Sequence, residues 1–189
     1  MASSCSKNGI NDADIDDIWL PNKLQSQYKT IINNASKLLL FSNYFLSDEN
    51  LLVTKKKPRF DLLPFKFQIS IWNPVPMLTS CIKSDILKRS PRFKKIHHED
   101  YIFWNDIFKK LNESNIKKLN SYECIYRVHN KSLSSNKIKA LKWNYHCYRE
   151  LGHNRILSLL ILSIRIVVEI ITLINIRVFQ SENKIKEIF

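Results

Sequence analysis

The chain has 189 residues, of which 44% are hydrophobic and 11% aromatic, which is enough apolar surface for one folded domain with a core. It contains only two glycines, which excludes the glycine-rich phosphate loops of P-loop and dinucleotide-binding proteins, because those turns need residues that tolerate a positive φ. Thirty Lys and Arg residues against 17 Asp and Glu give a formal net charge of +13, which favours an anionic partner such as nucleic acid, anionic lipid or sugar-nucleotide phosphate.

The first part of the chain predicts short helices and strands. We expect residues 1–13 to be an unstructured start, and we expect a helix within 18–33, where apolar residues recur at helical spacing. The apolar run 38–45 predicts a buried strand. Basic residues and prolines then predict a loop over 55–64.

The middle of the chain begins with Asn-Pro-Val-Pro at 73–76, which predicts an extended segment because a residue before proline disfavours the helical conformation. This segment leads into a predicted short strand at 77–82 and a short helix at 84–88. A longer helix is predicted over 99–111, with an apolar face that includes Trp104. We expect a further strand at 124–128.

The C-terminal part predicts two helices, at 134–151 and 155–179, with Gly152 ending the first. The second is an apolar run long enough to cross a bilayer, but Arg165 and Glu169 interrupt it. At about 100° per residue, its charged side chains fall in one arc of roughly 120°. These residues are Arg155, Arg165, Glu169 and Arg177. This amphipathic pattern fits two interpretations equally well, namely packing within the protein or on a partner, and binding to an anionic membrane surface. It fits a transmembrane span less well.

The cysteines and the start of the chain indicate a cytoplasmic protein. The four cysteines are far apart and form none of the close pairs that zinc and redox sites need. They are Cys5, Cys81, Cys124 and Cys147. The first nine residues contain no apolar run of the kind found in signal peptides. We therefore expect reduced thiols.

Three carboxylates, Asp14, Asp16 and Asp17, stand just before the first predicted helix. In an extended segment, side chains at i and i+2 point to the same side, so Asp14 and Asp16 can converge on one hard divalent cation such as Mg²⁺ or Mn²⁺. The same residues could equally cap the helix and complement its dipole. The spacing fits both interpretations.

Two further segments carry candidate chemistry. Glu99 and Asp100 lie at a predicted helix N-terminus, where Asp100 could accept a proton as a general base, although simple capping is the favoured interpretation on these residues alone. Arg127, His129 and Ser132 lie where a strand is predicted to turn into a helix. They could bind phosphate or complete a metal shell, or they could simply be a strand end and a helix cap.

Together, the order of these segments resembles that of bacterial family 2 glycosyltransferases. Asp-x-Asp-Asp-x-Trp-x-Pro-x-Lys-Leu at 14–24 resembles the metal-binding segment of that family. Glu-Asp-Tyr-x-x-Trp at 99–104 and Tyr-Arg-x-His-x-x-Ser at 126–132 resemble two of its later elements. The stretch 73–80 resembles the segment that precedes the family's middle strand.

The resemblance implies an α/β fold, a partial GT-A or Rossmann-like nucleotide-diphospho-sugar transferase domain over 14–133, followed by a C-terminal helical region at 134–189. Asp14 and Asp16 would hold Mg²⁺ or Mn²⁺ and the donor's diphosphate, with Asp17 in support.

The same resemblance assigns roles to the later segments. It implies that Asp100 takes the proton of the acceptor hydroxyl and that His129 lies near the metal or the diphosphate. Glu99, Arg127 and Ser132 would support them.

The implied activity is inverting, metal-dependent transfer of a sugar from a nucleotide-sugar donor to a saccharide or lipid-linked saccharide acceptor, in the synthesis of lipopolysaccharide, O-antigen or capsule. We expect a cytoplasmic location, peripheral at the inner face of the membrane, and no nucleic-acid partner. The alternative is a non-catalytic basic remnant that binds nucleic acid or membrane.

The residues before Asp14 do not match the family's early strands or their Tyr-Asn and Asp-Asp-Gly-Ser elements. The resemblance therefore predicts a truncated or split-gene chain, with a separate N-terminal half as one partner. It leaves open whether this chain is active alone.

Overall fold

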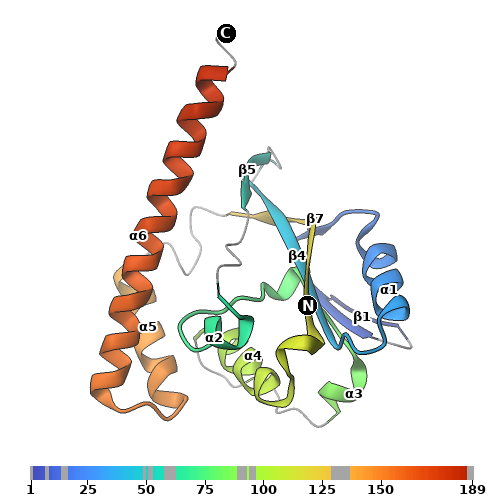
Figure 1. Ribbon diagram of the computed structural model, residues 1–189, viewed down its shortest axis with the longest axis horizontal. Helices are drawn as coiled ribbons and strands as arrows, with labels where there is room; N and C mark the ends of the chain where they lie inside the picture. The colour runs from blue at the N-terminus through green and yellow to red at the C-terminus, as the bar shows by residue number, and fades with distance from the viewer. Residues whose placement is uncertain are drawn as a thin grey trace. The chain divides into compact units, whose positions relative to one another are not determined.

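The computed structural model describes residues 2–6, 9–13, 17–48, 50, 53–57, 63–88, 93, 97–128 and 137–186. The chain forms two compact units, Met1–Lys137 and Ile138–Phe189. The first is a mixed α/β unit and the second is helical, which confirms the predicted α/β fold with C-terminal helices and is consistent with a partial Rossmann-like domain (Figure 1).

The first unit is built on a seven-stranded mixed sheet in the order β1-β2-β6-β4-β7-β3, with β5 also paired to β4. The central pair, β4 and β7, is parallel, and every other pair is antiparallel. The strands are β1 (Ala2–Ser6), β2 (Gly9–Ala13), β3 (Ile18–Trp19), β4 (Leu39–Ser47), β5 (Val53–Lys57), β6 (Cys81–Ile82) and β7 (Ile116–Arg127).

Helices cover both faces of this sheet, with α1 on one side and α2 and α4 on the other (Figure 1). The elements between the strands are α1 (Lys23–Asn33), α2 (Phe65–Gln68), the 3-10 turns η1 (Met77–Thr79) and η2 (Glu113–Asn115), α3 (Ser84–Leu87) and α4 (Glu99–Lys110). The Glu113 carboxylate accepts hydrogen bonds from the backbone N–H groups of Phe65 and Lys66, at 2.7 and 3.0 Å, and so caps the start of α2.

The core lies where β4 meets these helices. Leu39, Leu40 and Phe41 of β4 are fully buried, and Trp104 and Ile107 of α4 are almost equally buried. A strand covered on both faces needs apolar side chains on successive residues, which is the pattern of the run 38–45. The structure thus confirms the predicted buried strand and the predicted apolar face of the helix that begins at Glu99.

Several expectations differ from the structure. Residues 2–6 and 9–13 form paired strands where an unstructured start was expected, and β5 occupies part of the predicted loop 55–64. The predicted strand 77–82 is a 3-10 turn followed by two strand residues. The helix expected within 18–33 begins only at Lys23, because the residues before it pair with β7. For Ile18 and Trp19, pairing with a distant strand overrides the local helical spacing.

The second unit consists of α5 (Lys137–Glu150) and α6 (Arg155–Lys186). Gly152, with a φ of +91°, follows α5 as predicted, and this left-handed conformation suits glycine because it has no Cβ. The side chain of Asn154 caps α6 by accepting the Leu157 N–H at 2.8 Å. Within the described residues, neither helix has the length and apolarity that crossing a membrane would require.

Candidate active site

The short strand β3 anchors the acidic segment to the sheet. Ile18 and Trp19 pair with Ile125 and Cys124 of β7, and the Leu20 N–H donates to the Glu123 carbonyl at 2.9 Å. Asp17 directly precedes this pairing and therefore lies beside the end of β7. That end is also the carboxyl end of the parallel pair of strands, the edge at which ligands collect in open α/β sheets.

Trp19 is held in place from two sides. Its indole N–H donates to the Leu78 carbonyl at 3.1 Å, and the Cys124 thiol donates to the same carbonyl at 3.3 Å. On its face, the Lys23 ammonium lies 4.6 Å from the ring centroid, within the range of a cation–π interaction. The segment that follows the predicted metal-binding aspartates is therefore fixed to both β7 and η1.

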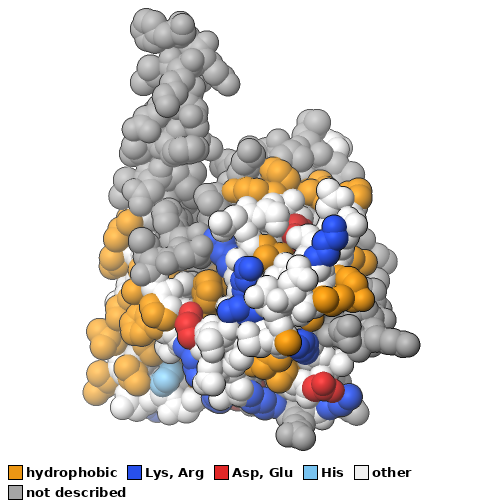
Figure 2. All heavy atoms as spheres, turned by 45° about the vertical axis from the view of Figure 1, so that its right-hand side comes forward, with side chains coloured by type: hydrophobic (Ala, Val, Ile, Leu, Met, Phe, Trp, Pro, Cys, Tyr) orange, Lys and Arg blue, Asp and Glu red, His pale blue; other side chains and the backbone are white. Residues whose placement is uncertain are grey.

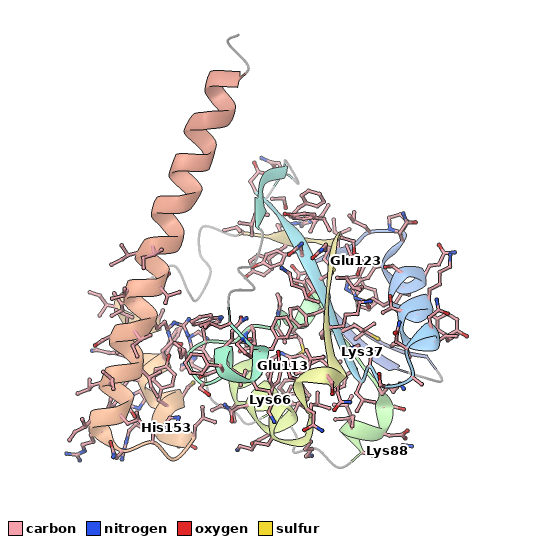
Figure 3. All side chains as sticks on the ribbon, in the orientation of Figure 1. Lys37, Lys66, Lys88, Glu113, Glu123 and His153 are labelled. Atoms are coloured by element: carbon pink, nitrogen blue, oxygen red, sulfur yellow. The ribbon has the colours of Figure 1, made fainter. Side chains whose placement is uncertain are left out.

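A buried polar network lies behind Trp19, between α1 and β7. The Lys23 ammonium donates to Gln27 Oε1 at 2.9 Å, and Gln27 Nε2 donates to Glu123 Oε2 at 3.1 Å and to the Thr79 carbonyl at 2.9 Å. Ser121 donates to Glu123 Oε1 at 2.8 Å. Glu123, labelled in Figure 3, thus points from β7 toward α1, and a neutral amide bridges a buried cation and a buried anion.

Burial changes the ionisation of this network. It lowers the pKa of Lys23, while the nearby Cys124, Cys81 and Glu123 act in the opposite direction. Burial also raises the pKa of the Cys124 thiol to about 12, and the Lys23 charge only partly offsets this effect. Cys124 therefore stays a neutral thiol at physiological pH, as expected for a structural rather than a nucleophilic cysteine.

Asp100 lies half-buried in the first turn of α4, and its carboxylate is oriented by Asn73. Asn73 Nδ2 donates to Asp100 Oδ2 at 2.8 Å, while Asn73 Oδ1 accepts the Val75 N–H at 2.9 Å. The second bond fixes which end of the amide faces Asp100. His98, two residues before Asp100 and directly before α4, has a φ of 58°, a left-handed conformation that is costly for a side-chain-bearing residue.

The segment from Asn73 to Leu78 connects the two candidate regions. At one end Asn73 binds Asp100, and at the other the Leu78 carbonyl binds Trp19, two residues after Asp17. Residues far apart in the sequence are therefore tied to one extended, proline-rich stretch. The proline rings restrict its backbone, which suits a rigid connection between the two regions.

The carboxyl ends of β4 and β7 carry two further polar groups. Ser47 pairs with Arg127, and the Val128 N–H donates to the Ser47 carbonyl at 2.9 Å. The Ser47 hydroxyl and the Arg127 Nε are buried and have no hydrogen-bond partner within the described part of the chain. Both are donors that suit an anionic ligand at the edge where Asp17 lies.

Comparison with known proteins supports a family relationship, although no protein-family profile matches the chain. It is 32% identical over 135 residues to an Escherichia coli protein named UDP-Glc:alpha-D-GlcNAc-diphosphoundecaprenol beta-1,3-glucosyltransferase, covering 68% of this chain and 49% of that protein. It is 30% identical over 151 residues to an uncharacterised glycosyltransferase of Methanocaldococcus jannaschii, covering 75% and 50%. It is 29% identical over 143 residues to one of Haemophilus influenzae, covering 74% and 54%. The chain is a relative of glycosyltransferases.

The chain spans about half the length of these glycosyltransferase relatives. The relationship confirms the predicted resemblance at the level of glycosyltransferases in general. It does not favour the alternative of a non-catalytic nucleic-acid-binding or membrane-binding remnant.

The residues predicted for a glycosyltransferase site are only partly covered by the structure. Asp14, Asp16, His129 and Ser132 lie outside the described residues. Asp17 and Arg127 are brought to the same edge of the sheet, and Glu99 is half-buried beside Asp100. Among the side chains that are described, no three His, Cys, Asp or Glu residues are grouped as a metal site. The roles of all these residues stay predictions.

Sequence reasoning missed several residues that shape this region. The sequence places Asn73 in an extended segment and in the stretch 73–80 that carries part of the resemblance, but it indicates no role for the side chain of Asn73 or of Ser47. Lys23 and Gln27 are one helical turn apart on α1 and both buried. A Lys and a Gln at this spacing usually lie on a solvated helix face. The sequence pattern therefore did not predict that these two side chains are buried.

Proposed function

We propose that the chain takes part in the transfer of a sugar from a nucleotide-sugar donor to a saccharide or lipid-linked saccharide acceptor in cell-surface polysaccharide synthesis. Its relation to three proteins named glycosyltransferases carries the proposal. The name of the E. coli relative specifies a UDP-glucose donor and a diphosphoundecaprenol-linked acceptor. A uridine diphosphate sugar and an isoprenoid-linked acceptor are therefore the first substrates to test.

The donor's diphosphate would bind at the carboxyl edge of β4 and β7. Asp14 and Asp16, with Asp17 in support, would hold Mg²⁺ or Mn²⁺, which would neutralise the charge of the departing diphosphate. Arg127 and Ser47 offer additional donors for its oxygens, and His129 and Ser132 lie two and five positions after Arg127 in the chain. This placement agrees with the general position of ligands in α/β sheets.

Asp100 would act as the base. Its carboxylate would take the proton of the acceptor hydroxyl as that hydroxyl attacks the anomeric carbon from the face opposite the leaving diphosphate, with inversion. Asn73 would act as a positioning residue, because its amide donates to Asp100 Oδ2 and leaves Oδ1 for the acceptor. One carboxylate base suffices for this reaction, since the metal serves the leaving group.

The proposal is tested by measuring sugar transfer from UDP-glucose to a GlcNAc-diphospho-lipid acceptor in the presence of Mn²⁺. Asp100→Asn should lower turnover by about 10²- to 10⁴-fold and leave donor affinity unchanged, because the amide keeps the shape but cannot take the proton. Asp17→Asn should instead raise the Mn²⁺ concentration needed for half-maximal activity. Asp106→Asn is the matched control on the same helix, where the carboxylate pairs with the exposed Lys109 at 2.9 Å.

The control should retain normal turnover, because an exposed ion pair contributes little. Near-normal transfer by Asp100→Asn would disprove its role as base. Absence of transfer from UDP-glucose and other uridine or thymidine diphosphate sugars, with a folded protein, would contradict the proposed function itself.

A further inference from the structure

Helix α6 turns its apolar side outward. Between Ile156 and Ile170, six of its aliphatic side chains are between 40% and 81% exposed. They are Ile156, Leu159, Leu160, Ile164, Val167 and Ile170. At about 100° per residue they form one continuous arc of roughly 140°, called here the α6 apolar arc. It extends over about 21 Å of helix at 1.5 Å per residue.

The opposite side of α6 carries its polar contacts. Ser158 is fully buried and Ile161 nearly so. The Arg165 guanidinium hydrogen-bonds to the buried Tyr148 of α5, so this residue faces the neighbouring helix, whereas Arg155 and Glu169 are exposed. Because Ser158 and Ile161 are buried on this side of α6, the apolar arc is left on the surface. The arrangement is the reverse of an ordinary surface helix, whose apolar side faces the core.

Exposed basic residues accompany the α6 apolar arc in the same unit. Lys139, Lys142 and Arg149 of α5 are exposed, and so is Arg155 at the start of α6. Arg149 donates to the His153 carbonyl at 2.6 Å, which places it at the turn between the helices. Figure 2 shows hydrophobic side chains gathered at the lower left, in the region where α6 begins.

We propose that this helical unit binds the surface of an anionic membrane by inserting the α6 apolar arc between the lipid headgroups. Aliphatic side chains together with Lys and Arg are the features of helices that lie in the membrane interface. The basic side chains complement the negative charge of the lipids, as does the net charge of +13 for the whole chain. The inference goes beyond the proposed function and does not depend on catalytic activity.

A second copy of the chain is the competing occupant of the arc. Two observations favour the membrane. The arc consists only of Ile, Leu and Val, whereas the centres of protein interfaces are enriched in Trp, Tyr and Arg. The charge of +13 on each copy also opposes self-association, while it favours an anionic lipid surface.

The test is flotation of the full chain with phosphatidylcholine vesicles that contain about 30% phosphatidylglycerol, compared with pure phosphatidylcholine. We expect binding to the anionic vesicles that weakens with salt. Replacing Ile156, Leu160, Ile164 and Val167 together by Gln should lower the partition coefficient by at least about tenfold. These positions are exposed, so the circular dichroism spectrum and the monomeric state should not change.

The matched control replaces the exposed apolar residues of α1, Leu24, Tyr28 and Ile32, by Gln. This variant should bind vesicles like the unmodified chain. Equal loss of binding in both variants, or no binding of the unmodified chain, would overturn the proposal. So would a dimer, measured by light scattering, that the α6 substitutions convert to a monomer without any vesicle binding.

Discussion

Replacing Gln27 by Leu should destabilise the first unit by about 4 kcal/mol. Gln27 is 1% exposed and makes three hydrogen bonds, to the Lys23 ammonium, the Glu123 carboxylate and the Thr79 carbonyl. A hydrogen bond to a charged group is worth about 1.5–3 kcal/mol and a neutral one about 1 kcal/mol. The simple sum is about 4–7 kcal/mol, and we take the lower end because bonds in one network are not additive and Leu keeps most of the packing.

The assay is urea unfolding at neutral pH, followed by tryptophan fluorescence with linear extrapolation. This signal reports mainly on the first unit, which contains Trp19, Trp72 and Trp104. Gln25→Leu is the control, because Gln25 is exposed on the same helix and should change the free energy of unfolding by less than about 0.5 kcal/mol.

A second comparison tests the physical cause. In a chain that already carries Lys23→Met and Glu123→Leu, both charges are gone, so Gln27→Leu should cost no more than about 1.5 kcal/mol. The reasoning would be refuted if Gln27→Leu alone cost less than about 1 kcal/mol. It would also be refuted if the cost were the same with and without the two charged partners.

Two other residues give further predictions. The Cys124 thiol has a pKa of about 12 in the folded chain, against an ordinary value of 9.0, so the unfolded state loses this proton first as the pH rises. The free energy of unfolding should therefore fall by about 1.4 kcal/mol by pH 10. Cys124→Ala should remove this loss, measured by urea titrations at pH 8 and pH 10. Lys23, with its lowered pKa, contributes in the opposite direction, but it does so in both proteins. If the free energy of unfolding changed equally with pH in both proteins, the assignment to Cys124 would be contradicted. Asn73→Ala should lower turnover by about tenfold without changing donor affinity, because Asp100 loses the amide that orients it. Asn73→Asp should not rescue turnover, since a second carboxylate cannot donate to Asp100, and full activity in either variant would exclude a positioning role.

The sequence by itself determined the elements whose apolar pattern is local. The run 38–45 predicted the buried strand β4, and the spacing of apolar residues after Glu99 predicted α4 with Trp104 in the core. The order of the acidic, Glu-Asp-Tyr and Tyr-Arg-x-His segments also predicted the relation to glycosyltransferases. The apolar patterns are visible in sequence because each depends on residues within a few turns or a few strand positions.

Tertiary structure alone decided how the candidate site is assembled. Ile18 and Trp19 have the spacing of a helix but pair with β7, and Gln27 is buried against a glutamate 96 residues away. The hydrogen bond between Asn73 and Asp100 likewise joins residues 27 positions apart. In α6 the pattern predicted two sides, but contact with α5 decided which side is exposed. Periodicity records which side chains are apolar, whereas strand pairing and the burial of polar groups depend on partners that only the folded chain brings within hydrogen-bond distance.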